Sequence, residues 1–178
     1  MGFYLNLEGL EAINKKIESL DKSLKEEVSN EINASALKMQ STAKRLAPVN
    51  FGQLRNSIQL SPQTTGSLTY IVAATASYAP YVEFGTGGKV SIPAGFEADA
   101  AAFRGGKSGS FKEMVDALAL WVKRKGIGNG KNERGIAYAI AFKILQKGLR
   151  PQPFLIPSYE QEKPKLIKRL KDLLNAES

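Results

Sequence analysis

The chain has 178 residues and a formal net charge of +8, and it contains neither cysteine nor histidine. Without cysteine it can form no disulfide, thiolate nucleophile or zinc finger, and without histidine it lacks the commonest general base and the imidazole metal ligand. Catalysis would have to use carboxylate, lysine or tyrosine chemistry. The length suits one compact domain that buries a core without disulfides or metals.

The excess positive charge is concentrated toward the C-terminal end of the sequence. Residues 1–110 hold 11 Lys and Arg against 10 Asp and Glu, whereas residues 111–178 hold 14 against 7. Such a one-sided field either faces a polyanion, usually nucleic acid, or keeps a helical surface soluble. No apolar stretch approaches the roughly 20 residues that span a bilayer, and residues 1–6 lack the basic start of a signal peptide. We therefore expect synthesis in the cytoplasm and no membrane partner.

A long amphipathic helix is predicted for the N-terminal part. Apolar residues recur from Leu10 to Leu46 with the α-helical period. An unbroken helix over this range would be roughly 55 Å long at 1.5 Å per residue, which exceeds the width of a globule of this size. It either projects onto another subunit or breaks. Ser23 and Glu26 have the spacing of a capping box, which favours a main helix from about residue 24 to Leu46, ended by Pro48.

An antiparallel hairpin is predicted next. Two extended runs, Leu54–Leu60 and Leu68–Ala74, are separated by a turn cluster that contains proline and glycine. Residues 85–110 contain seven glycines and are predicted to form a long loop.

Three helices are predicted in the C-terminal part. Helical periodicity covers residues 111–125, where Ser110 is placed to cap the first turn, and residues 134–147, where Gly148 occupies the C-cap position. Residues 150–157 contain three prolines and suit an edge strand or an extended segment. A basic helix is expected from about residue 159 to residue 174.

Two patterns that could carry catalysis have simpler interpretations. Residues 101–108 satisfy a permissive form of the phosphate-binding loop, but the segment before them is acidic and contains glycine, whereas a true loop follows a buried strand. Glu97 and Asp99 are close in sequence, yet no scaffold holds them across a cleft as a glycosidase pair requires. We assign no catalytic, cofactor-binding or metal-binding residue.

The densest basic cluster follows the single tryptophan, Trp121. Lys123, Arg124 and Lys125 could contact a phosphate backbone without reading bases. Alternatively, Trp121 belongs to the core and the three cations complement the negative end of a helix. We keep Lys123, Arg124 and Lys125 as candidate DNA-facing residues.

The segment Tyr78–Gly87 is the most unusual in the chain. Three aromatic residues alternate with small residues around one acid, and a glycine turn follows. A structural interpretation packs Tyr78, Tyr81 and Phe84 beneath the hairpin. Glu83 would then bond to the backbone or pair with an arginine, because a buried acid needs a partner.

Three stretches, taken together, resemble the tail-component family of long-tailed bacteriophages, the tail-completion or head–tail joining proteins. They are Ala47-Pro48 with Gly52-Gln-Leu-Arg-Asn-Ser-Ile58, the segment Tyr78–Gly87, and Pro151-Gln-Pro-Phe-Leu-Ile-Pro157. Their order and approximate spacing agree with the family pattern over about residues 28–175. The chain departs from it at Asn50-Phe51, where the family commonly has an acid and a threonine, and at residues 88–147, which exceed the shortest members in length.

The resemblance implies a non-enzymatic virion protein with an α+β fold, in which a long N-terminal helix and C-terminal helices pack on a small antiparallel sheet. It implies one tail-completion-like domain over residues 1–178, with residues 88–147 inserted as a loop plus helices. Six residues would form the fold or subunit-interface element of the family: Tyr78, Tyr81, Glu83, Phe84, Gly85 and Thr86.

The resemblance also implies partners. The chain would assemble with copies of itself into a ring, a hexamer, in the virion neck, where it would join connector or stopper proteins to the tail-tube or tail-terminator protein. A closed ring needs head-to-tail interfaces, and the basic C-terminal third could line a lumen for passing DNA. The competing hypotheses are a stand-alone nucleic-acid-binding protein and, as the weakest, a small hydrolase or nucleotide-dependent enzyme.

Overall fold

The computed structural model describes residues 3–4, 22–49, 52–62, 68–76, 78–103 and 110–176. The chain divides into two compact units: unit 1 comprises residues 1–79 and 152–178, and unit 2 comprises residues 80–151. Unit 2 contains the whole stretch 88–147 that we expected as an insertion, and it extends that stretch at both ends.

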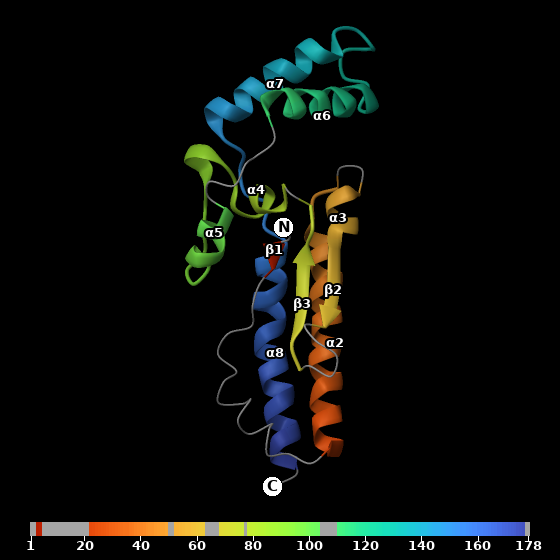
Figure 1. Ribbon diagram of the computed structural model, residues 1–178, viewed down its shortest axis with the longest axis vertical. Helices are drawn as coiled ribbons and strands as arrows, with labels where there is room; N and C mark the ends of the chain where they lie inside the picture. The colour runs from red at the N-terminus through yellow and green to blue at the C-terminus, as the bar shows by residue number, and fades with distance from the viewer. Residues whose placement is uncertain are drawn as a thin grey trace. The chain divides into compact units, whose positions relative to one another are not determined.

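The described elements confirm the α+β class, with helices predominating over one small antiparallel sheet (Figure 1). In chain order they are β1 (Phe3–Tyr4), α2 (Lys22–Leu46), α3 (Gln53–Ser57), β2 (Ile58–Pro62), β3 (Tyr70–Ala74), α4 (Ala79–Phe84), η1 (Gly87–Lys89), α5 (Glu97–Phe103), α6 (Phe111–Arg124), α7 (Glu133–Lys147) and α8 (Leu155–Ala176).

In unit 1, the long helices α2 and α8 lie side by side and the hairpin β2–β3 packs against α2 (Figure 1). The sheet has the order β1-β3-β2, and both pairings are antiparallel. The predicted apolar stripe is confirmed from Leu24 to Ala43, because its members are buried along α2. Val28 and Ile32 contact Leu166 and Leu170 of α8 in one core cluster. The predicted stripe between residues 10 and 20 lies outside the described residues.

A polar network also joins α2 to α8. The guanidinium of Arg169 donates to the carboxylate of Glu162 at 2.6 Å and also binds Glu31 and the hydroxyl of Ser35. Ser35 and Glu162 are buried. The hydrogen bond that Arg169 donates to Glu162 raises the pKa of Arg169 above its ordinary value, so the arginine stays charged. A buried carboxylate is stable here because it is paired and hydrogen-bonded.

The start of the hairpin and of α2 differ from prediction. The expected strand over residues 54–60 is wrong in its first half, because α3 occupies residues 53–57 and the strand begins at Ile58. A local bond stabilises this turn: the Ser57 hydroxyl donates to the Leu54 carbonyl at 2.8 Å. The predicted capping role of Ser23 is also wrong, because Ser23 lies inside α2.

Unit 2 is built around the helical hairpin α6–α7 (Figure 1). Val115 and Val122 of α6 pack against Ala137 and Ala141 of α7, where the small alanines let the helices approach closely. The predicted cap is confirmed: the Ser110 side chain accepts from the Glu113 backbone, and the Glu113 carboxylate accepts from the Ser110 backbone.

Two segments that were predicted to lack helices contain helical residues. The expected loop over residues 85–110 is wrong in part, because η1 and α5 lie within it; α5 is rich in alanine and has Glu97 and Asp99 in its first turn, where acids complement the helix dipole. The extended segment predicted for 150–157 is wrong from Leu155 onward. Pro157 is compatible with that helix because the N–H groups of a first turn need no helical acceptor.

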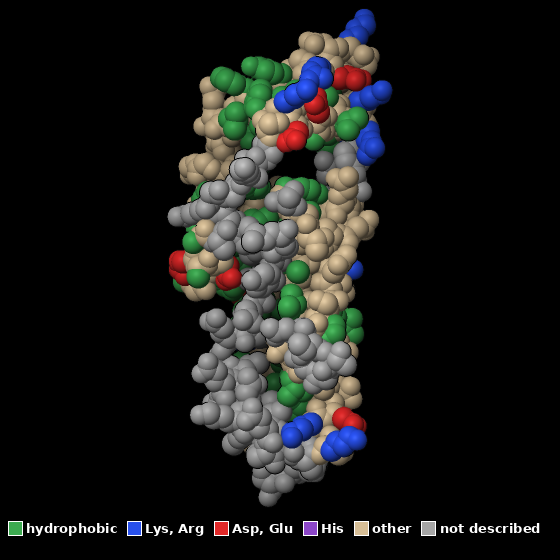
Figure 2. All heavy atoms as spheres, viewed as in Figure 1, with side chains coloured by type: hydrophobic (Ala, Val, Ile, Leu, Met, Phe, Trp, Pro, Cys, Tyr) green, Lys and Arg blue, Asp and Glu red, His purple; other side chains and the backbone are tan. Residues whose placement is uncertain are grey.

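The positive charge is more localised than the comparison of residues 1–110 with residues 111–178 indicated. Residues 111–151, which contain α6 and α7, hold 9 Lys and Arg against 3 Asp and Glu, whereas residues 152–178 hold 5 against 4. Figure 2 shows lysine and arginine side chains gathered over the α6–α7 hairpin. The basic region is therefore this hairpin of unit 2, and residues 152–178 are close to neutral.

Candidate functional site

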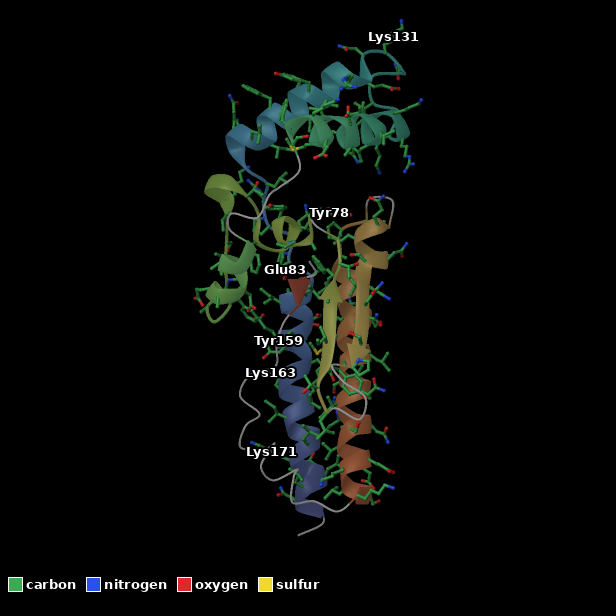
Figure 3. All side chains as sticks on the ribbon, in the orientation of Figure 1. Tyr78, Glu83, Lys131, Tyr159, Lys163 and Lys171 are labelled. Carbon is green, nitrogen blue, oxygen red and sulfur yellow. The ribbon has the colours of Figure 1, made fainter. Side chains whose placement is uncertain are left out.

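The segment Tyr78–Gly87 forms the short helix α4 and the turn that follows it. Glu83 and Phe84 are 1% and 5% exposed, whereas Tyr78 is 40% exposed and Tyr81 is half-buried. The prediction that all three aromatics are buried is therefore wrong for Tyr78. Figure 3 marks Tyr78 at the start of α4 and Glu83 along it. Partial burial raises the pKa of the Tyr78 phenol, so it remains protonated at neutral pH and is a poor general base.

Two hydrogen bonds tie the end of this segment to the chain beyond α7. The backbone N–H of Thr86 donates to the Leu149 carbonyl at 3.0 Å, and the Leu149 N–H donates to the Thr86 hydroxyl at 2.8 Å. We call this pair of bonds the Thr86–Leu149 bridge. It joins residues 63 positions apart within unit 2.

The bridge explains two glycines. A Cβ on Gly85 would lie 2.7 Å from the Leu149 carbonyl oxygen and 3.0 Å from Cδ of Pro151. A Cβ on Gly148 would lie 2.0 Å from the Thr86 carbonyl oxygen. Both residues also have positive φ, 78° and 68°. Only glycine fits at these positions, because the two backbones approach too closely for a side chain.

Two of the resembling stretches thus meet in space. Thr86 and Gly85 belong to the segment Tyr78–Gly87, and Pro151 begins the third stretch. Gly85 and Thr86 were predicted from the sequence, whereas Leu149 was not, and Gly148 was expected only to end a helix. Gly148 does end α7, since its N–H donates to the Ile144 carbonyl at 2.9 Å. The Gly148-Leu149 sequence alone contains no sign of the second contact.

The first stretch forms a separate structural turn in unit 1. Gly52 has φ 73° before α3, and the Ser57 carbonyl accepts from the Thr75 backbone at 3.0 Å. Gln40 of α2 donates to the Ile58 carbonyl at 3.1 Å. These bonds place the hairpin on α2, so this stretch has a role in folding of unit 1.

The basic cluster lies at the end of α6. Lys123, Arg124 and Lys125 are exposed, whereas Trp121 is partly buried against the core of the hairpin. Trp121 therefore packs in the core, as the structural alternative predicted, while the three cations lie at the surface. Lys131 lies in the turn between α6 and α7 and extends away from the helices (Figure 3). The cluster lies at the end of α6, whereas the bridge joins Thr86 to Leu149 beyond α7.

Other chemistry finds little support in the part of the chain that the structure describes. Within that part there is no group of three or more His, Cys, Asp and Glu side chains that could hold a metal, and no helix that is long and apolar enough to cross a membrane. Helix α5 occupies residues 97–103, where a phosphate-binding loop would need a strand. Residues 104–109 of that candidate loop lie outside the described residues.

Comparison with known proteins identifies one family. Residues 11–85 match the family model of the HK97-gp10-like proteins, described as "Bacteriophage HK97-gp10, putative tail-component". No curated protein and no solved structure matches the chain. The match confirms the resemblance to a phage tail-component family over residues 11–85. It covers all but the last two residues of the segment Tyr78–Gly87 and ends before the third stretch.

Proposed function

We propose, from the match of residues 11–85 to the phage tail-component family, that this protein is a tail-completion component that forms a ring at the head–tail junction. In this role it joins connector or stopper proteins to the tail-tube or tail-terminator protein, with no reaction to catalyse. The observation that carries the proposal is the family match. A hexameric ring would be built by head-to-tail contacts between identical subunits.

The division into two units supports a modular version of this role. The family match ends at residue 85, unit 1 ends at residue 79, and unit 1 resumes at residue 152. We therefore propose that unit 1 is the tail-component core and that residues 88–147 are an insertion. The Thr86–Leu149 bridge would then close the base of the insertion, because its two sides flank that stretch.

Under this proposal, the residues predicted to form the fold or subunit-interface element have two different roles. Glu83, Phe84 and Gly85 are buried, which suits a role in holding the fold. Tyr78 and Tyr81 retain exposed surface, and partly exposed tyrosines are frequent anchors at protein interfaces. We propose Tyr78 and Tyr81 as the subunit-contacting members of the segment.

The exposed cations at the end of α6 are proposed to face passing DNA. Lys123, Arg124 and Lys125 lie in the hairpin that carries most of the excess charge. Their contacts would be to phosphates, so they would attract DNA without sequence preference.

Charge reversal tests this assignment. Replacing Lys123, Arg124 and Lys125 with Glu should reduce the slope of log affinity against log salt for duplex DNA by up to about 2.7, which corresponds to three phosphate contacts. The matched control reverses three exposed lysines of α8: Lys165, Lys168 and Lys171. If both triple variants lower DNA affinity equally, the cluster has no specific DNA role.

A stand-alone nucleic-acid-binding protein is the alternative, supported by the isoelectric point of about 9.6. That class predicts that an isolated monomer binds duplex DNA tightly at physiological salt. The ring proposal predicts weak binding by the monomer, since a lumen must let DNA pass. Fluorescence anisotropy with a labelled duplex distinguishes the two.

The experiment for the main proposal is a nonsense mutation in the gene of the phage that encodes the chain. We expect lysates that contain filled heads and separate tails, as seen by negative-stain electron microscopy, with joining restored when the protein is supplied in trans. Intact infectious particles made without the protein would contradict the proposal.

A further inference from the structure

Helix α7 exposes a row of large apolar side chains. Tyr138, Phe142 and Leu145 are 55%, 50% and 63% exposed, and Leu149, just beyond the helix, is 40% exposed. The spacing of Tyr138, Phe142 and Leu145, four and then three residues, is that of a seam along which one helix packs on another. Figure 2 shows hydrophobic side chains at the surface of α7. We call these four residues the α7 stripe.

The other apolar face of α7 is already used within unit 2. Ala137 and Ala141 are buried against α6, and Ile136 and Ile140 pack against the same cluster. A surface helix normally has one apolar stripe, whereas α7 has two. Large apolar side chains exposed in a row mark a protein contact, so the α7 stripe has the character of a face that receives a further helix.

The surroundings of the α7 stripe are basic. Lys112 and Arg134 line an open groove of about 580 Å³ beside Tyr138, and Arg134 also pairs with Asp116 at 2.9 Å. The ring of Tyr138 meets Phe111 edge-on with the centroids 5.2 Å apart. Residues 111–151 carry three times as many cations as acids, 9 against 3. A second copy that offered the same face would bring like charges together, whereas an acidic surface would be attracted.

We propose that the α7 stripe is the docking site for an acidic amphipathic helix of another protein. This inference rests on the proposed function and defines the chemistry of the partner: a neighbouring virion protein whose helix presents apolar side chains at three- and four-residue spacing, flanked by Asp or Glu. Apolar contacts supply most of the affinity, and the cations of the hairpin select the acidic partner. The Thr86–Leu149 bridge fixes the backbone at the end of the stripe.

A designed peptide tests the proposal with the full chain. The probe is a fluorescently labelled peptide of three heptads, with Leu at the two seam positions and Glu at most others. A matched peptide carries Lys in place of Glu. Fluorescence anisotropy should show binding of the acidic peptide in the micromolar range and binding at least about tenfold weaker for the basic one.

Surface variants locate the binding site. Phe142→Ser and Leu145→Ser should each weaken binding of the acidic peptide by about tenfold. The control is Leu120→Ser, because Leu120 is 60% exposed on α6 and lies outside the stripe; it should leave binding unchanged. Because all three substitutions replace exposed side chains, each variant should retain its helices, and circular dichroism verifies this.

Several results would overturn the proposal. Equal affinity for the two peptides would show that the surface does not prefer acidic partners. Unchanged peptide affinity of the Leu145→Ser variant would show that the α7 stripe is not the binding site. Preferential, Leu145-dependent binding to phosphatidylglycerol vesicles would make the stripe a membrane contact. Self-association abolished by Leu145→Ser in native mass spectrometry would make it a contact between copies. The peptide assay does not require a ring. Its failure would therefore leave the proposed role in the neck untouched, and that role is tested separately by the nonsense mutation.

Discussion

Replacing Gly148 with alanine should damage unit 2 far more than replacing Gly88 or Gly130 of the same unit. The backbone of Gly148 has φ 68° and ψ 167°, a combination that is almost restricted to glycine and costs another residue about 1 to 3 kcal/mol. The new Cβ would also lie 2.0 Å from the Thr86 carbonyl oxygen. That oxygen belongs to a backbone and cannot rotate away, so the two chain segments must separate.

Separation of the segments would break both hydrogen bonds of the Thr86–Leu149 bridge. Each bond contributes about 0.5 to 1.5 kcal/mol net. Together with the backbone cost, the expected loss for Gly148→Ala is about 2 to 6 kcal/mol. A folded unit of 72 residues is stable by only about 4 to 11 kcal/mol, so this loss is a large fraction of the total.

Urea unfolding followed by tryptophan fluorescence measures the effect, because Trp121 is the single tryptophan and lies in unit 2. With a slope of about 1 to 1.5 kcal/mol per molar urea, the midpoint should fall by about 1.3 M or more. Gly130→Ala is the matched control: Gly130 has φ 77°, but its Cβ would meet no atom within 4 Å, so a loss of only about 1 to 2 kcal/mol is expected. Gly88→Ala, with open space and no positive φ, should change stability by less than about 1 kcal/mol. Equal losses for Gly148→Ala and Gly130→Ala would refute the close-approach argument.

Three further substitutions test other contacts. Ser110→Ala removes the capping box of α6 and should cost about 1 kcal/mol in the same fluorescence assay; no loss would mean that the cap is energetically unimportant. Arg169→Met leaves Glu162, whose side chain is 8% exposed, without its cation, and should destabilise unit 1 by about 2 to 4 kcal/mol in calorimetry, whereas the double variant with Glu162→Gln should recover part of that loss. Pro164→Ala should stabilise α8 by about 1 to 3 kcal/mol, because Pro164 lies inside the helix and cannot donate a backbone hydrogen bond; a drop in melting temperature would show that Pro164 has a packing role.

The helices were predictable where the pattern is local and regular. The buried stripe of α2, the Ser110 cap of α6 and the end of α7 at Gly148 all depend on residues within a few positions of one another. Helix α5 was missed because its seven residues are surrounded by glycines. The first turn of α8 was missed because Pro157 suggested an extended chain, although a first turn tolerates proline.

For the candidate site, the sequence predicted which residues of the segment matter but not what they contact. The segment Tyr78–Gly87 was unusual enough to select Gly85 and Thr86, but their partner Leu149 lies 63 positions away. No periodicity or short motif connects such distant positions. The exposed stripe of α7 was hidden for another reason. The spacing of Ile136, Ile140, Ile144 and Leu145 predicts a single apolar face, but only Ile136 and Ile140 of these pack in the α6–α7 core cluster. The prediction is wrong for Leu145, which is 63% exposed, and it did not include Phe142.

The most direct test of the ring proposal is a cryo-electron microscopy reconstruction of the neck of the phage that encodes this protein. We predict a closed ring of identical subunits between connector and tail tube, in which the paired helices α2 and α8 with their small sheet fit each subunit, and in which Lys123, Arg124 and Lys125 border the lumen. A neck whose density is fully explained by other proteins would contradict the account.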